Sequence, residues 1–202
     1  MSAALLHRFR RVPALQYWKP VQTGIESDDD TAEVLRLTGS PPERALHDGV
    51  RLPRPLSPHL SASLAGTPIS LATLMDTAWS QPGTVRWVVE GAGGVLVPLN
   101  EQELMVDLMT VLGLPVVIAS RSGLGTINHT LLTIEALRAR AVPIAGVVML
   151  GVPNTDNRIA IETRGHVQVV GELAPLDPLT PDSLQEAADR VARGGELDSF
   201  FT

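Results

Sequence analysis

The 202-residue chain contains no cysteine, which excludes disulfide bonds and cysteine nucleophiles. No apolar run approaches the roughly 20 residues that a membrane span requires, and the first residues lack the long apolar core of a secretory signal. The net charge of −6 argues against nucleic acid as the main partner. We therefore expect a cytoplasmic protein that binds neither membrane nor nucleic acid.

Lysine is also scarce, because fifteen of the sixteen basic residues are arginine and Lys19 is the exception. An ammonium is a compact point charge, and a planar guanidinium cannot always take its place. A chain with so strong a bias toward arginine is expected to keep a lysine where an ammonium is needed. Lys19 is therefore a candidate catalytic residue; a chance lysine at the end of a strand is the alternative.

Length and composition favour one domain over 1–202, since 44% hydrophobic residues can build a sizeable core and no change of composition marks a boundary. The second half alternates strand and helix patterns. Strands are expected over 115–119, 144–150 and 166–171, and helices over 126–140, 154–163 and 181–193. Such alternation predicts an α/β fold with a mostly parallel sheet and helices on both faces.

The first half is less regular. We expect a helix over 2–11, a strand over 14–18 that delivers Lys19 and Thr23 to a loop, and helices over 32–37, 70–80 and 101–112. Residues 39–69 are rich in proline and are predicted to form a long ordered loop that covers a site. One of the three aspartates at 28–30 is expected to cap the following helix.

The stretch 88–98, V-V-E-G-A-G-G-V-L-V-P, is the most informative part of the chain. The apolar run over 85–89 predicts a strand buried on both faces, and it ends on Glu90 and three glycines. In open α/β sheets, ligands bind where strands end, and glycines let the backbone approach a phosphate. The alternative is an ordinary glycine-rich turn with a solvated Glu90.

Two further segments carry candidate binding groups. Residues 122–129, S-G-L-G-T-I-N-H, follow a predicted strand and open a helix, so their backbone N–H groups and Asn128 could hold an anion. A plain helix cap is the alternative there. Ser57 and His59, on either side of a proline, could lie near a ligand, although we favour a surface histidine.

Five segments, taken in order, resemble the dethiobiotin synthetase family. They are residues 18–24 (W-K-P-V-Q-T-G), the aspartates at 28–30, residues 57–59 (S-P-H), residues 89–94 with Pro98 and Leu99, and residues 125–129 (G-T-I-N-H). The resemblance covers nearly the whole chain and implies a P-loop NTPase-like fold and a homodimer. It also implies an ATP- and Mg²⁺-dependent ligase of biotin biosynthesis, which converts 7,8-diaminopelargonic acid and CO2 to dethiobiotin through a carbamate and a carbamic-phosphoric anhydride.

The resemblance assigns roles to particular residues. It makes Lys19 catalytic and places Mg²⁺ and nucleotide on Asp30 and Glu90, with Asp28 as the alternative to Asp30. Substrate contacts are implied for Thr23 and, from the neighbouring subunit, for Gly125, Thr126 and Asn128. Further nucleotide contacts are implied for Gly91, Ala92, Gly93, Ala174, Pro175 and Leu176.

The chain departs from the family pattern in two ways. It contains no G-x-x-x-x-G-K-[ST] motif, and residues 2–11 correspond to the helix that this loop would begin, so the first strand and the Walker A loop are absent. We expect a start codon assigned too far downstream; the alternative is a non-catalytic dimeric binding or regulatory paralogue. A missing central strand should leave apolar surface uncovered and a strand edge unpaired. Second, Leu150 and Gly151 stand where some members have an asparagine that binds adenine, which leaves the base preference open.

Overall fold

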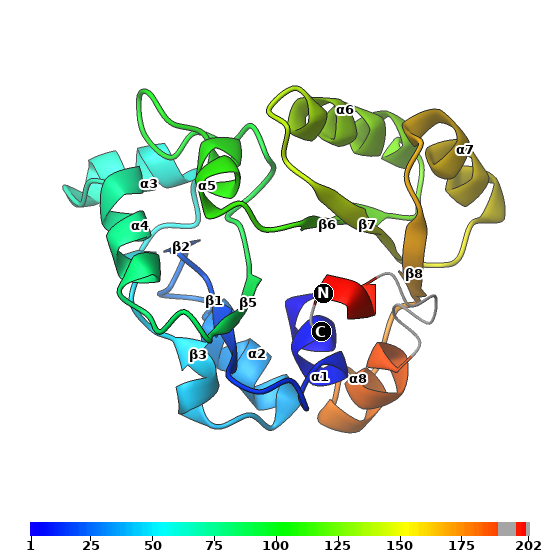
Figure 1. Ribbon diagram of the computed structural model, residues 1–202, viewed down its shortest axis with the longest axis horizontal. Helices are drawn as coiled ribbons and strands as arrows, with labels where there is room; N and C mark the ends of the chain where they lie inside the picture. The colour runs from blue at the N-terminus through cyan, green and yellow to red at the C-terminus, as the bar shows by residue number, and fades with distance from the viewer. Residues whose placement is uncertain (190–196, 201–202) are drawn as a thin grey trace.

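The computed structural model describes residues 1–189 and 197–200, which form parallel strands with helices on either side (Figure 1). One sheet has the order β3-β1-β5, with β1 at Leu15–Trp18, β3 at Ala45–Leu46 and β5 at Arg86–Val89. Another has the order β6-β7-β8, with strands Val116–Arg121, Ile144–Leu150 and Val169–Leu173. A short pair joins β2 (Val21–Thr23) to β4 (Val50–Leu52). All these pairs are parallel, which confirms the predicted α/β class.

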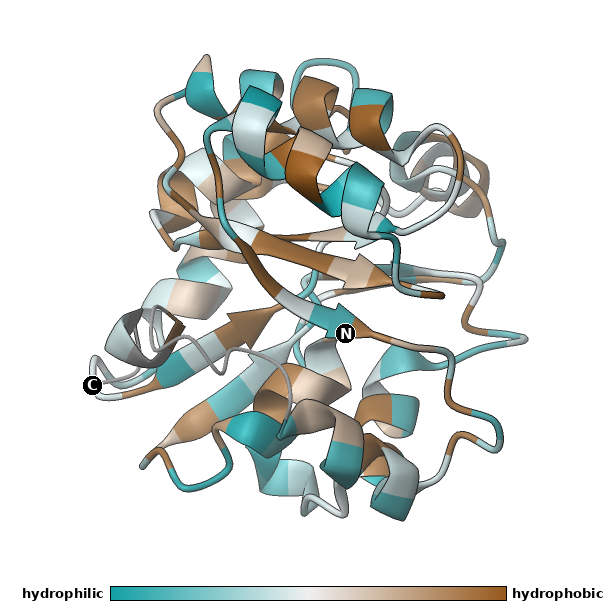
Figure 2. Cartoon of the chain, turned by 90° about the vertical axis from the view of Figure 1, so that its right-hand side faces the viewer, coloured by the Kyte–Doolittle hydropathy of each residue, from teal (hydrophilic) through white to brown (hydrophobic). Residues whose placement is uncertain are grey.

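The helices form layers on both sides of the strands. Their bounds are α1 Ser2–Arg8, α2 Asp30–Thr38, α3 Pro58–Ala65, α4 Leu71–Trp79, α5 Met105–Leu112, α6 Thr126–Arg138, α7 Thr155–Gly165 and α8 Pro181–Ala188, with 3-10 turns η1 (Pro42–Arg44) and η2 (Leu197–Phe200). Helices α1, α2 and α8 pack together on one side, and α6 packs on α7 on the other. Figure 2, turned by 90°, shows the strands running between these helical layers.

A hydrophobic cluster links the two three-stranded sheets. Leu6 of α1, Leu15 of β1, Val148 of β7 and Leu184 of α8 are all buried in it. The apolar face of α1 therefore covers strands of both sheets, which is why this short helix is held although seven residues are marginal for a helix alone. Packing in this cluster fixes where β1 ends, and so where the residue after it lies.

The prediction that the strand over 85–89 is buried on both faces is wrong. Val88 is buried in β5, but Arg86 is exposed and Val89 only partly buried. In the described chain β5 pairs with β1 on one edge, and neither its other edge nor the outer edge of β6 has a partner strand. A cavity of about 630 Å³ lies there, lined by apolar residues of both strands, and it leaves Ala119 of β6 exposed. The uncovered surface and unpaired edges expected from the sequence are thus present.

Other differences concern element boundaries. The proline-rich residues 39–69 are not one long loop, because they contain β3, β4 and the helix α3. Helix α3 tolerates Pro58 because the backbone N–H that proline lacks would have no partner within the helix at the first helical position. Thr23 lies in strand β2 rather than in a loop, and the helix predicted from 101 begins only at Met105. Helix α8 ends at Ala188; residues 190–193 of its predicted span lie outside the described residues.

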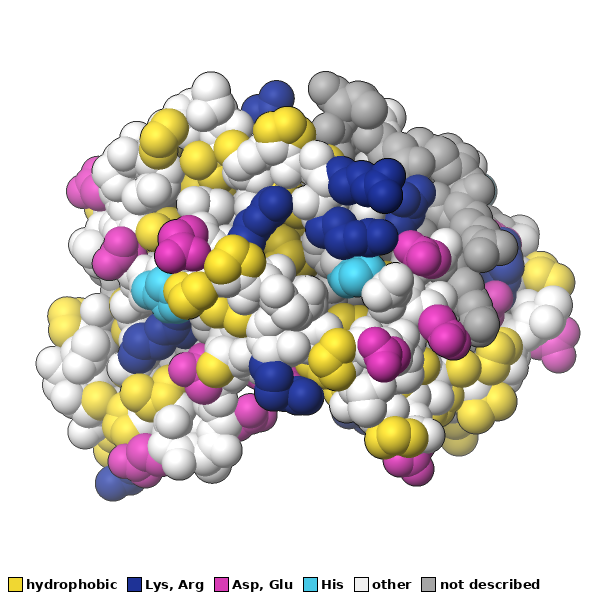
Figure 3. Space-filling view, turned by 90° about the horizontal axis from the view of Figure 1, so that it is seen from below, with side chains coloured by type: hydrophobic (Ala, Val, Ile, Leu, Met, Phe, Trp, Pro, Cys, Tyr) yellow, Lys and Arg dark blue, Asp and Glu magenta, His cyan; other side chains and the backbone are white. Residues whose placement is uncertain are grey.

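The surface carries charges of both signs. Figure 3 shows, on the face seen from below, several basic side chains near the middle with acidic side chains around them. Within the described part of the chain, no helix is long and apolar enough to cross a membrane. That nucleic acid is not the main partner stays a prediction.

Leu15→Ala should lower the free energy of unfolding by about 2–5 kcal/mol, because Leu15 is fully buried where β1 meets α1 and its truncation leaves a cavity. Leu132→Ala in α6 is the matched control, since Leu132 is 55% exposed, and it should change the free energy by less than about 0.5 kcal/mol. Urea denaturation followed by circular dichroism measures both. Equal losses would contradict this assignment of the core.

Candidate functional site

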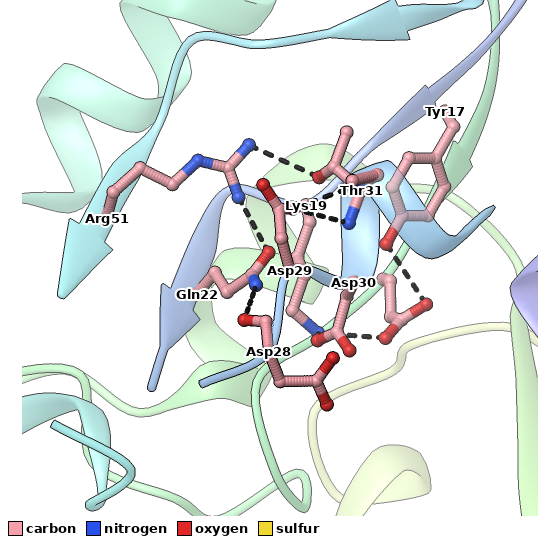
Figure 4. A network of polar contacts seen from close by, with 10 residues as sticks. Tyr17, Lys19, Gln22, Asp28, Asp29, Asp30, Thr31 and Arg51 are labelled. Atoms are coloured by element: carbon pink, nitrogen blue, oxygen red, sulfur yellow. Dashed lines mark hydrogen bonds and ion pairs between the residues drawn. The ribbon is translucent and has the colours of Figure 1, made fainter. Parts of the chain in front are cut away.

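Lys19 lies between two carboxylates directly after β1. Its Nζ atom is 2.7 Å from Asp30 Oδ2 and 2.8 Å from Glu90 Oε1. The Lys19 side chain is only 7% exposed, whereas those of Asp30 and Glu90 are 40% and 30% exposed. Figure 4 shows the ammonium pointing at the Asp30 carboxylate. The chain has thus buried its only lysine with two opposite charges around it.

Parallel pairing of β1 with β5 brings Lys19 and Glu90 together. Trp18 is opposite Val89 in this ladder, and the Glu90 backbone N–H donates to the Trp18 carbonyl oxygen at 2.9 Å. Both residues after these positions therefore lie at the carboxyl edge of the same sheet, where ligands bind in open α/β folds. The Trp18 indole N–H donates to the Asp48 carbonyl oxygen at 2.7 Å and ties the end of β1 to the loop before β4.

The three aspartates at 28–30 make different contacts. Asp29 is the N-cap of α2, and its Oδ1 accepts hydrogen bonds from the backbone N–H groups of Thr31 and Ala32 at 3.0 and 3.1 Å. This confirms that one of the aspartates caps the helix. Asp30 begins the helix and turns its carboxylate to Lys19. Asp28 contributes its carbonyl oxygen to the Gln22 side chain.

Tyr17 belongs to the same cluster, although it was not among the site residues predicted from the sequence. Its hydroxyl donates to Glu90 Oε2 at 3.1 Å, so both oxygens of this carboxylate are engaged. Because side chains two apart in a strand lie on the same face, the spacing of Tyr17 and Lys19 was a signal that could have found it. Tyr17 itself is fully buried.

Lys19 and Glu90 are both charged at neutral pH. Burial opposes the charge on Lys19, but the carboxylates of Glu90 and Asp30 outweigh it and raise the lysine pKa above its ordinary value of 10.5. Burial likewise opposes the charge on Glu90, yet Lys19 and hydrogen bonds from Ser2 and Tyr17 hold its pKa below the ordinary 4.5. The pKa of Tyr17 is raised far above 10.0, mainly by burial and to a smaller extent by the nearby Glu90 carboxylate. Its hydroxyl therefore stays protonated.

The glycine-rich segment after Glu90 opens on the cavity between β5 and β6. Gly91 and Gly93 line this cavity together with Glu90, while Ala92 is buried. Gly93 has a φ of +79°, which disfavours any residue with a side chain. A Cβ there would also come within 2.9 Å of a Val97 methyl group. The absence of side chains leaves main-chain groups accessible beside the Glu90 carboxylate.

The S-P-H segment reaches this region through its backbone. His59 lies in the first turn of α3, and its backbone N–H donates to the Pro98 carbonyl oxygen at 3.3 Å. The His59 side chain itself is exposed. Among the described residues, the S-P-H segment is therefore linked to Pro98 through its backbone and not through the His59 side chain.

Other predicted site residues follow strands of the second sheet. Gly125 is the left-handed N-cap of α6 after β6, Thr126 is buried against Thr130, and Asn128 is exposed. The turn 174–176 follows β8. Because β6, β7 and β8 are parallel, these two segments lie at one edge of their sheet, but this sheet is not the one that holds Lys19. Thr23 lies elsewhere again, at the end of β2 opposite Leu52.

The region after β7 has its own polar links. Asn154 caps α7 by accepting a hydrogen bond from the Asn157 backbone N–H at 2.9 Å. The Asn157 side chain donates to the Ser122 carbonyl oxygen at 2.8 Å and so connects α7 to the loop before α6. Asn154 thus acts locally as a helix cap.

Asp30 and Glu90 have the hard carboxylate oxygens that Mg²⁺ prefers as ligands. No group of three or more candidate metal ligands occurs in the described parts of the chain. However, Mg²⁺ is commonly held by one or two carboxylates, water and substrate phosphates. The two carboxylates converge on the Lys19 ammonium, at 2.7 and 2.8 Å.

Comparison with known proteins identifies relatives over almost the whole chain. A family model described as an AAA domain matches residues 1–183. The ATP-dependent dethiobiotin synthetase BioD of Brucella melitensis is 43% identical over 199 residues, which cover 98% of this chain and 89% of the relative. The protein of the same name from Brucella ovis is 42% identical over the same extent.

Glu90→Gln should lower the free energy of unfolding at neutral pH by about 1–3 kcal/mol, because it leaves the buried Lys19 ammonium with one carboxylate fewer. Since the pKa of Glu90 is depressed, its contribution is present above the ordinary pKa of 4.5 and is lost as pH falls through the folded-state value. The difference between variant and parent should therefore shrink as the pH is lowered from neutral through about 4.5 and below. Urea titrations over this series of pH values measure it.

Glu33→Gln is the control for this prediction, because Glu33 pairs with Arg36 on the surface of α2 and its loss should have a much smaller effect at neutral pH. A Glu90→Gln difference that does not vary with pH would show that Glu90 acts through packing rather than through its charge.

Proposed function

The chain belongs to the dethiobiotin synthetase family, and from this premise we propose that it makes dethiobiotin from 7,8-diaminopelargonic acid, CO2 and ATP. The observation that carries the proposal is the buried Lys19 ammonium between Asp30 and Glu90, at the edge of a parallel sheet beside an open glycine-rich segment. An enzyme of this kind must hold several negative charges close together, and this cluster is suited to that task.

The reaction creates negative charge at two points. One amine of the substrate attacks CO2 and, after losing a proton, becomes a carbamate. A carbamate oxygen then attacks the γ-phosphorus of ATP and ADP leaves, which gives a carbamic-phosphoric anhydride. The second amine attacks the carbamoyl carbon, phosphate leaves and the urea ring closes. The Lys19 ammonium compensates the charge of the carbamate and of the transferring phosphoryl group.

Asp30 and Glu90 would hold Mg²⁺, which supplies charge neutralisation beside the phosphates when bound. Tyr17 supports this role because its hydrogen bond fixes one Glu90 oxygen while the other faces Lys19. The main-chain groups of Gly91, Ala92 and Gly93 are proposed to contact the nucleotide, as is the turn of Ala174, Pro175 and Leu176. The Thr23 hydroxyl is proposed to bind the diamine or its carbamate.

We further propose that the enzyme is a homodimer in the cytoplasm and that Gly125, Thr126 and Asn128 bind the distal substrate carboxylate in the neighbouring subunit. Two observations support this. The segment begins α6, where backbone N–H groups favour an anion. Leu124, directly before it, is fully exposed, and Asn128 is exposed too, so both are accessible to a second copy.

Lys19→Met should reduce dethiobiotin formation by about 10²–10³-fold, because the variant keeps the side-chain volume but removes the charge. Lys19→Arg should also lose most activity, since a guanidinium does not provide a compact point charge. Mass spectrometry of dethiobiotin formed from 7,8-diaminopelargonic acid, bicarbonate, ATP and Mg²⁺ is the assay, and circular dichroism checks the fold. A fully active Lys19→Met chain would refute the role of Lys19.

Asp30→Asn should raise the Mg²⁺ concentration needed for half-maximal rate by about tenfold or more, because it removes a charged ligand. Asp28→Asn is the matched control and should leave this concentration unchanged, since Asp28 is engaged through its carbonyl oxygen. The opposite result would move the metal ligand from Asp30 to Asp28.

The 202 residues contain no Walker A motif, and this observation favours a second candidate, a non-catalytic dimeric binding or regulatory protein. The same assay separates the two. If the parent chain forms no dethiobiotin under any nucleotide or Mg²⁺ concentration, while it still binds the diamine, the second candidate takes precedence.

A further inference from the structure

Gln22 and Arg51 form a polar pair beside the Lys19 cluster (Figure 4). They are directly opposite each other in the parallel ladder of β2 and β4. Arg51 Nη1 donates to Gln22 Oε1 at 2.8 Å, and Gln22 is only 1% exposed. Because a buried amide is costly unless its groups are paired, this arrangement is built into the ladder rather than adventitious.

The pair also donates hydrogen bonds to both ends of the segment 28–31, which contains Asp30. Gln22 Nε2 donates to the Asp28 carbonyl oxygen at 2.9 Å. Arg51 Nη2 donates to Thr31 Oγ1 at 3.3 Å, and Thr31 is itself buried. Figure 4 shows these contacts running from Arg51 and Gln22 to the residues on either side of Asp30. Asp28, two residues before Asp30, and Thr31, directly after it, are thus tied to two paired strands.

Asp30 needs such support because its own side chain is 40% exposed. An exposed carboxylate loses side-chain entropy when it is held in one geometry, and solvent screens its attraction to a cation. Its position 2.7 Å from Lys19 Nζ therefore depends on a fixed backbone at the start of α2. The Asp29 cap fixes the helix end locally, and the Gln22–Arg51 pair connects that end to the sheet edge.

We propose that Gln22 and Arg51 are positioning residues that hold Asp30 in place for a divalent cation; the inference rests on the proposed role of Asp30 in metal binding. Arg51 performs this through its planar fork, which donates to two acceptors on different elements at once. The pair's hydrogen bonds go to Asp28 and Thr31 rather than to the Asp30 carboxylate, so its effect is exerted through the backbone that carries Asp30.

The test compares Arg51→Met with Arg36→Met in the full chain, using Mn²⁺ as the probe and calorimetry to measure its affinity. Arg36 lies on the same helix α2 but pairs with Glu33 on the surface, so it controls for the loss of a nearby positive charge. We expect Arg51→Met to weaken Mn²⁺ binding by about tenfold and Arg36→Met to leave it unchanged. Arg51→Lys should recover part of the loss.

Two measurements separate positioning from a general structural role. In an Asp30→Asn background, Arg51→Met should cause no further loss of Mn²⁺ affinity, because two changes that act through one group are not additive. Amide hydrogen exchange, read by mass spectrometry without metal, should become faster over residues 28–31 in Arg51→Met and not in Arg36→Met. Arg51 is partly exposed, so its replacement leaves the core intact.

The outcomes are distinct. Unchanged Mn²⁺ affinity in Arg51→Met, an additive loss in the Asp30→Asn background, unchanged exchange over 28–31, or no Mn²⁺ binding by the parent chain would each overturn the inference. If the parent binds Mn²⁺ and Arg51→Met weakens it, yet no dethiobiotin forms, the proposed reaction fails while the positioning role stands.

Discussion

The constraint on which the site depends is the burial of a single ammonium. Removing the Lys19 charge from water costs several kcal/mol unless opposite charges and hydrogen bonds compensate it. Asp30 and Glu90 provide the compensation, and each comes from a different element. The end of β1, the end of β5 and the first turn of α2 must therefore meet at one point.

Parallel pairing explains how these elements meet. Because β1 and β5 run in the same direction, the residues that follow them are neighbours although they are 71 positions apart in the chain. The third element, α2, enters through a loop and has no ladder of its own to place it. The Asp29 cap and the Gln22–Arg51 pair hold the start of α2 in place instead. The short β2–β4 ladder therefore helps to position Asp30.

The same rule places a second set of polar groups at the ends of β6 and β8. Gly125, Thr126 and Asn128 open α6 there, and the turn 174–176 follows β8. Within the described chain these groups lie on a different sheet from Lys19, with a cavity between β5 and β6. The proposed reaction binds ATP together with a diamine that carries a distant carboxylate, which requires such a spread of anion sites, and the proposed homodimer would bring them together.

Local patterns in the sequence were sufficient for the α/β class, for placing Lys19 and Glu90 directly after strands, and for the family, because each rests on a short run of residues. Strand periodicity, glycine content and motif order are visible without knowing what packs against them. The exposure of β5, the different contacts of Asp28, Asp29 and Asp30, and the contacts of Tyr17, Gln22 and Arg51 were not visible in this way. They depend on strand pairing and helix capping between residues distant in the chain, and only the tertiary structure decides which side chains those contacts bring within hydrogen-bond distance.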